Sequence, residues 1–195
     1  MKTSHQARPL LLLLLLSLGC NKGPDPTPAA TTAVIKSDAE AKAAYSYVKA
    51  FYEGKIKPSI PSNKSSTVSS QLSGSTGKAT TSGSVSYTNS SSSLSSYTST
   101  IIDVTTSFSS YTDTGYTATG SVRYFDSHDF SSSCTSSGYC AYSSHTSISY
   151  SATSLTIEFE YQGKKIKDTV KIDASAPILS WTIKLTSSSG ITYTW

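Results

Sequence analysis

Residues 155–170, LTIEFEYQGKKIKDTV, specify an antiparallel β-hairpin. Apolar and polar side chains alternate from Leu155 to Tyr161, which is the period-two pattern of a strand with one buried face. Gln162 and Gly163 then form a two-residue turn, in which the glycine accepts the positive φ that hairpin turns require. A second strand beginning at Lys164 closes the hairpin.

The register of this hairpin follows from pairing Tyr161 with Lys164. In that register opposite charges meet on one face and apolar side chains meet on the other, whereas a shift of one residue would turn every side chain to the wrong face. The pairs predicted in this way are Glu160 with Lys165, Phe159 with Ile166, Glu158 with Lys167, Ile157 with Asp168 and Leu155 with Val170.

Asp168 departs from this pattern, because it falls opposite Ile157 on the apolar face. A buried carboxylate without a partner is costly. Three interpretations are open: the residue bulges outward, it binds a basic partner such as Arg123, or it lies at the margin of the sheet. Of these we favour the margin.

The same alternation recurs through residues 83–195. Eight short strands in this span predict a mainly β fold, an antiparallel sandwich or small barrel of about seven to eight strands, preceded by one amphipathic helix. Besides the two strands of the hairpin, the runs are Val85–Tyr87, Ile102–Phe108, Tyr116–Tyr124, Ile148–Tyr150, Leu179–Leu185 and Ile191–Trp195.

An amphipathic helix is predicted over residues 37–54. Ser37 and Glu40 form a capping box, in which the serine hydroxyl meets the Glu40 amide and the glutamate reaches back to the Ser37 amide. Gly54 is expected to end the helix and Pro58 to prevent its resumption. One apolar stripe, which we expect to pack on the sheet, consists of Ala41, Ala44, Tyr45, Val48, Phe51 and Tyr52.

Residues 55–82 are rich in serine, threonine, glycine and proline, and their few apolar residues follow no period. This composition predicts a loop. A weak strand from Val68 to Leu72 remains an open alternative.

The first twenty residues have the parts of an export signal. Lys2 and Arg8 precede a run of leucines that is too short to span a bilayer. Residues 16–20, LSLGC, resemble the lipobox of bacterial lipoproteins, and an ordinary signal peptide with an incidental cysteine is the alternative. The resemblance implies that residues 1–19 are removed and that Cys20 becomes the diacylated first residue.

A lipid anchor implies attachment to a membrane of the bacterial cell envelope. Asn21 follows the cysteine at a position where inner-membrane lipoproteins often carry aspartate, so the resemblance favours the outer membrane, with the domain either periplasmic or surface-exposed. Residues 20–36 are rich in proline and poor in bulky apolar side chains, which predicts an extended tether.

The charge content argues against a nucleic-acid partner. Charged residues make up 14% of the chain, and its formal net charge is +4. Removing Lys2 and Arg8 with the signal leaves 14 basic and 12 acidic side chains, a net charge of +2. A nucleic-acid-binding surface is strongly basic and clustered. The predicted surface is instead weakly charged and rich in hydroxyl groups.

The cysteines Cys134 and Cys140 lie in residues 126–145, which we expect to form a long polar loop between strands. In an exported chain this spacing predicts a disulfide. A metal site built from His128, Asp129 and His145 is a weaker alternative, because the paired cysteine spacing of zinc sites is missing.

No motif of a hydrolytic nucleophile or of a phosphate-binding loop occurs in the sequence. We therefore expect a non-catalytic module without a cofactor, which binds a glycan, a wall component or another envelope protein. Exposed aromatic rings near the cysteines are the candidate contacts, namely Tyr124, Tyr139 and Tyr142. The alternative is a metal-assisted hydrolase that uses the loop 126–145.

Overall fold

A computed structural model of the chain describes residues 32–61, 63–177 and 180–195. The predicted signal peptide (1–19), the predicted lipidation site Cys20, most of the tether (20–36) and Leu179 lie outside these residues.

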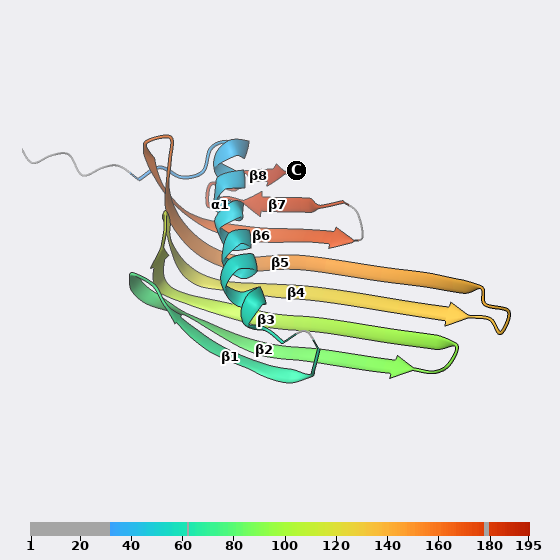
Figure 1. Cartoon of the computed structure of the whole chain (residues 1–195). Coiled ribbons are helices and arrows are strands. Elements are labelled where there is room, and N and C mark those ends of the chain that lie inside the picture. The colour runs from blue at the N-terminus through green and yellow to red at the C-terminus, as the bar shows by residue number, and fades with distance from the viewer. Residues whose placement is uncertain (1–31, 62, 178–179) are drawn as a thin grey trace, which may run out of the picture.

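The described residues form one open antiparallel sheet, in which the strands follow each other in chain order and one helix crosses one face (Figure 1). The prediction of a mainly β fold with one preceding helix is confirmed, and the sheet is not closed into a barrel. The strands are β1 (Ser66–Ser73), β2 (Thr76–Ser91), β3 (Ser95–Asp113), β4 (Tyr116–Cys134), β5 (Cys140–Tyr161), β6 (Lys164–Pro177), β7 (Thr182–Thr186) and β8 (Thr192–Thr194).

The hairpin of β5 and β6 has the predicted register, from Tyr161 opposite Lys164 to Leu155 opposite Val170. Gln162 and Gly163 both have positive φ, at 50° and 74°, as the tight turn requires. On the face away from the helix, which we call the outer face, Glu158 accepts from Lys165 at 2.7 Å and from Lys167 at 3.3 Å. The helix covers the opposite face, the helix-side face.

The helix α1 (Asp38–Phe51) begins at the predicted cap, where the Ser37 hydroxyl accepts the amide of Glu40 at 3.3 Å. The Glu40 carboxylate accepts the amide of Lys36 rather than that of Ser37. The end was predicted wrongly, because Gly54 lies inside a further π-helical turn, η1 (Tyr52–Ile56), followed by a 3-10 turn, η2 (Lys57–Ser59).

Burial of Tyr52 and Ile56 accounts for this extension of the helix. Both side chains are at most 1% exposed, so continuing the helical path covers more apolar surface than a stop at Gly54 would. The six residues of the predicted apolar stripe are likewise buried against the sheet.

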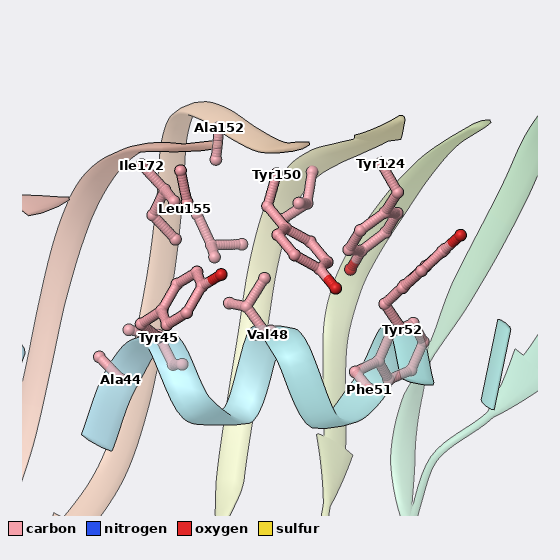
Figure 2. Close-up of a cluster of buried hydrophobic side chains, with 14 of the residues drawn as sticks. Ala44, Tyr45, Val48, Phe51, Tyr52, Tyr124, Tyr150, Ala152, Leu155 and Ile172 are labelled. Atoms are coloured by element: carbon pink, nitrogen blue, oxygen red, sulfur yellow. The ribbon is translucent and has the colours of Figure 1, made fainter. Parts of the chain in front are cut away.

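An aromatic layer joins the helix to the sheet (Figure 2). The ring of Tyr52 stacks on that of Tyr124, with 4.6 Å between the centroids, and Tyr45 meets Tyr150 edge to face at 5.9 Å. Such ring pairs contribute about 0.5–1.5 kcal/mol beyond the burial of their area. The side of the sheet under α1 is therefore the core of the molecule.

The segment 55–82 is not a loop throughout, because β1 and the first part of β2 lie within it. Val68 and Ala79 are buried on the helix-side face, and the hydroxyls of Thr81 and Thr106 meet across the buried side of β2 and β3 at 2.8 Å. The paired hydroxyls satisfy each other, so that these two polar side chains can lie in the core.

Shifts of register bend the sheet around the helix. Those in β4 and β5 lie at Gly120–Arg123 and at Ala152–Leu155, and a side chain at Gly120 would collide with the backbone of Ser154. Such β-bulges increase local twist and curvature. The bulge at Ala152–Leu155 also reverses the alternation, so that the runs expected as two strands, ending at Tyr150 and beginning at Leu155, form the single strand β5.

Asp168 stays in the predicted register, faces the helix side and is 2% exposed. Its carboxylate accepts the amide of Ile35 and the amide of Ser188, both at 3.0 Å. It neither bulges outward nor binds Arg123, which pairs with Asp103. β7 does not pair with this part of β6, so the residue does lie at a margin of the sheet, and its amide partners offset the cost of burial.

Candidate functional site

The strands β2 to β5 continue well beyond the helix and form a projecting four-stranded layer (Figure 1). We call residues 87–100 and 128–146 the arm. The prediction of a long polar loop over residues 126–145 is wrong, because β4 runs to Cys134 and β5 starts at Cys140. Backbone pairing between neighbouring strands runs along these serine-rich segments as far as the disulfide.

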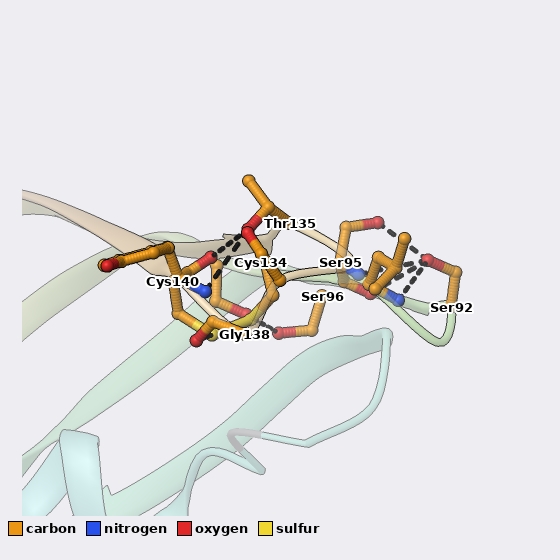
Figure 3. Close-up of a disulfide and its surroundings, with 11 residues drawn as sticks. Ser92, Ser95, Ser96, Cys134, Thr135, Gly138 and Cys140 are labelled. Carbon is orange, nitrogen blue, oxygen red and sulfur yellow. Dashed lines mark hydrogen bonds between the residues drawn. A yellow bond between two sulfur atoms is a disulfide. The ribbon is translucent and has the colours of Figure 1, made fainter.

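A disulfide between Cys134 and Cys140 closes the tip of the arm, as the spacing predicted (Figure 3). Within the turn, the Thr135 hydroxyl accepts the amide of Tyr139 at 3.2 Å. The Cys134 amide donates to the carbonyl of Leu94 at 2.6 Å, which joins this turn to the β2–β3 turn. The tip is thus held by one covalent bond, by hydrogen bonding within the β4–β5 turn and by a hydrogen bond to the β2–β3 turn.

A pocket of about 520 Å³ lies at the root of the arm, where the end of the helical segment meets β3 and β4. The 3-10 turn η2 and strand β4 bring together one acidic and two basic side chains on the helix-side face. The residues that line the pocket are Lys57, Pro58, Ile60, Thr100, Ile102, Asp126 and His128.

Asp126 is the centre of this pocket's polar network, and its side chain is completely buried. Lys57 Nζ donates to Oδ2 at 3.0 Å, and His128 Nε2 lies 2.6 Å from Oδ1. The other ring nitrogen of His128 lies 3.2 Å from the hydroxyl of Thr146. Burial raises the pKa of the Tyr52 phenol, and the nearby Asp126 carboxylate raises it further.

Two exposed rings follow the pocket along the helix-side face of the arm. Phe130 is 44% exposed and Tyr142 is 70% exposed, and their ring centroids lie 6.3 Å apart with 31° between the planes. Phe130 lies two residues beyond His128 on β4, so strand alternation puts both on the same face. Directly opposite residues on the same face add hydroxyl groups, namely Thr98 and Ser144 beside Phe130 and Ser132 beside Tyr142.

The predicted ligand contacts separate into two groups. Tyr139 and Tyr142 are exposed near the tip, whereas Tyr124 is 0% exposed beneath Tyr52 in the core. Tyr124 therefore cannot contact a ligand, and burial holds its pKa well above the ordinary tyrosine value. The prediction failed because alternation along β4 identifies the face of a residue but not whether a helix covers it.

The alternative metal ligands do not converge. Asp129 and His145 lie directly opposite each other on the outer face, where the Tyr97 hydroxyl reaches Asp129, whereas His128 points to the helix side. Within the described ranges, no group of three or more His, Cys, Asp and Glu side chains could hold a metal ion. These three residues are therefore not placed to bind one metal ion together, as the alternative of a metal-assisted hydrolase requires.

Sequence reasoning missed Lys57 and Phe130 as site residues. Phe130 carried a usable signal, because its spacing from His128 puts the two on one face if the segment is a strand rather than a loop. Lys57 carried none, since 69 positions separate it from Asp126 and only the folded chain brings them together.

Comparison of the chain with protein-family models, curated proteins and solved structures finds no match. In the described part of the chain, the helices fall short of the length and apolar character that crossing a membrane requires.

Proposed function

We propose that this protein is an exported, lipid-anchored binding module of the bacterial cell envelope, which binds a glycan without catalysis through the helix-side face of its arm. The single observation that carries the proposal is the exposed pair of rings, Phe130 and Tyr142, beside a polar pocket. The two rings adjoin each other, and an exposed apolar patch with a polar rim is the kind of surface that marks a binding site.

The chemistry of this face suits a neutral sugar chain. A pyranose ring has apolar C–H faces that pack on aromatic rings and a rim of hydroxyls that bond to polar groups. Thr98, Ser132 and Ser144 supply hydroxyl partners around the two rings. The positive charge of Lys57 is compensated by Asp126, so the face offers no strong field for a polyanion.

The position of the N-terminal segment supports display of the arm. Ala33 forms a parallel bridge with Ile166, which lies opposite Phe159 near the β5–β6 turn. From Phe159 to Cys140 the contour of β5 is on the order of 60 Å at about 3.3 Å per residue. A lipid on Cys20 would therefore leave the tip of the arm unobstructed.

Co-sedimentation with insoluble cellulose, chitin and purified peptidoglycan sacculi tests the glycan proposal. We expect binding to at least one of these, with a bound fraction at least tenfold lower for the double variant Phe130→Ala with Tyr142→Ala. The matched control is Tyr97→Ala, which removes an exposed ring from the outer face and is expected to leave binding unchanged.

The same experiment tests the absence of catalysis, since we expect no soluble sugar in the supernatant. Binding to none of the three polymers, or equal loss in the control and the double variant, would contradict the glycan proposal.

Metabolic labelling with an alkyne fatty acid tests the anchor. We expect label on the wild-type chain in the outer-membrane fraction, and none on Cys20→Ala. An unlabelled wild-type chain would show that the lipobox resemblance misleads, while leaving the glycan assay independent.

A further inference from the structure

Strand β1 forms one edge of the sheet and lies along its lower boundary in Figure 1. Among the described residues it pairs with β2 alone, in an unbroken register from Ser66 opposite Val85 to Ser73 opposite Lys78. A strand with one partner turns alternate backbone N–H and C=O groups away from the sheet, where another strand can pair with them.

The other margin of the sheet is protected. β8 is only three residues long, and the part of β6 that β7 leaves uncovered pairs with the N-terminal segment. There the Ala33 amide donates to the Lys165 carbonyl at 3.0 Å, and the Lys167 amide donates to the Ala33 carbonyl at 2.9 Å. Short edge strands and covering segments are the devices by which soluble proteins prevent edge pairing.

Strand β1 carries none of these devices. Its sequence, STVSSQLS, contains no charged residue and no proline, and its pairing with β2 has no bulge. With eight residues, β1 is also longer than the typical strand of about five to six residues. The edge therefore remains able to accept a strand.

We propose that β1 pairs with β1 of a second copy of this chain, antiparallel about a two-fold axis at Ser70. This register puts Val68 opposite Leu72 on the helix-side face and Ser69 opposite Gln71 on the outer face. Val68 is buried and Leu72 half-buried, whereas Ser69 and Gln71 are exposed, so like environments meet.

Other registers lose this match or shorten the pairing: a shift of four residues sets Val68 or Leu72 opposite itself but leaves at most five residues of β1 paired. A shift of one residue would put the helix-side faces of the two copies on opposite sides of the joined sheet, so that apolar side chains of one copy meet polar side chains of the other. A shift of two residues puts Val68 opposite Ser70 or beyond the end of the strand. Because β1 has no charge, two copies meet without repulsion at this edge, and the self-complementary pattern is what a two-fold interface requires.

The pairing makes one continuous sheet of two copies. The arm lies on the amino-terminal side of β1, so the two-fold axis points the two arms in opposite directions while both helix-side faces stay on the same side. Two helix-side faces on the same side of the joined sheet would bind a long polymer with avidity, because the second contact becomes intramolecular.

Cysteine cross-linking of the full-length chain in intact envelopes tests this register. Ser70 lies opposite itself at the axis, and directly opposite residues have Cα separations that suit a disulfide. We expect Ser70→Cys to give a disulfide-linked dimer after mild oxidation. Thr67→Cys is the matched control, because Thr67 lies opposite Ser73 of the other copy and should remain monomeric.

A charge exchange in the Ser70→Cys background tests the outer-face pairs. Ser69→Lys with Gln71→Lys sets like charges opposite each other between copies, and we expect the dimer yield to fall at least tenfold. Ser69→Glu with Gln71→Lys sets opposite charges there and should retain the yield. Both double variants alter the same two exposed positions, so a folding defect would reduce both equally.

Any of three results would overturn the proposal. The first is the absence of a dimer with Ser70→Cys, and the second is cross-linking of Thr67→Cys to the same extent as Ser70→Cys. The third such result is an equal dimer yield from the two charge variants. Thermal melting of each variant separates these outcomes from failure to fold, because each should melt within a few degrees of the wild type.

Discussion

At the scale of single residues, Asp168 shows how a polar group inside an apolar face becomes structural. Its carboxylate joins the N-terminal segment, through Ile35, to the turn between β7 and β8, through Ser188. The Tyr193 hydroxyl donates to the Ile35 carbonyl at 3.3 Å on the same side. One buried carboxylate thus connects three segments that are distant in the sequence.

Replacing Asp168 with asparagine should destabilise the fold. The amide NH₂ would face a backbone N–H, so one of the two buried donors would lose its acceptor, at a cost of about 2–3 kcal/mol. Chemical denaturation gives the free energy of unfolding, and hydrogen exchange should show loss of protection at the Ile35 or Ser188 amide. Asp173→Asn, on the exposed outer face of the same strand, is the control, expected within about 0.5 kcal/mol of the wild type.

At the scale of elements, the β5–β6 hairpin depends on its register and its cross-strand charges. Hydrogen bonding from Lys165 is the main cause that lowers the pKa of Glu158, and Lys167 lowers it further. The pKa is therefore lower in the folded state than in the unfolded state. The stabilisation is present above the unfolded value, about 4.3, and is lost as the pH falls through the folded value.

Glu158→Gln should therefore reduce stability at neutral pH and have little effect in acid. We expect a loss of about 0.5–1 kcal/mol at pH 7, because the pairs are partly exposed, and convergence with the wild type at about pH 2–3. Denaturant melts across this pH range measure it. The control, Glu160→Gln, should give a smaller loss of stability, since both lysines bind Glu158. A loss in Glu158→Gln that persists unchanged at low pH would argue against a charge effect.

At the scale of the whole molecule, the structure divides into a body with a core and an arm with two exposed faces. The helix covers the bent part of the sheet, and the arm lies beyond it (Figure 1). With little buried apolar area, the arm is held by ladder hydrogen bonds and by the Cys134–Cys140 disulfide. Local stability in proteins follows such differences in burial.

Hydrogen exchange should therefore separate the two parts. We expect the helix and the strands beneath it to exchange only on global unfolding, and the arm to exchange by local opening. Reduction of the disulfide should speed exchange near the tip by up to about thirtyfold, corresponding to about 2 kcal/mol for so short a loop. Exchange of arm and body at one common rate would contradict this division.

Local patterns in the sequence were sufficient for several elements. The alternation around Gln162-Gly163 predicted every cross-strand pair from Tyr161–Lys164 to Leu155–Val170, and the Ser37 cap predicted the start of the helix. Both signals are local: they arise from residues close in the chain whose side chains differ sharply in polarity. The spacing of Cys134 and Cys140 likewise predicted their disulfide.

Only the tertiary structure decided the length of the strands, the burial of Tyr124 and the pocket at Asp126. Serine and threonine tolerate both faces of a sheet, so a serine-rich segment carries no amphipathic period, and pairing with neighbouring strands determines whether it is loop or arm. Lys57 and Asp126 meet because buried Tyr52 and Ile56 prolong the helix over β4. Contacts between distant segments depend on how elements pack, and that information is spread over the whole chain.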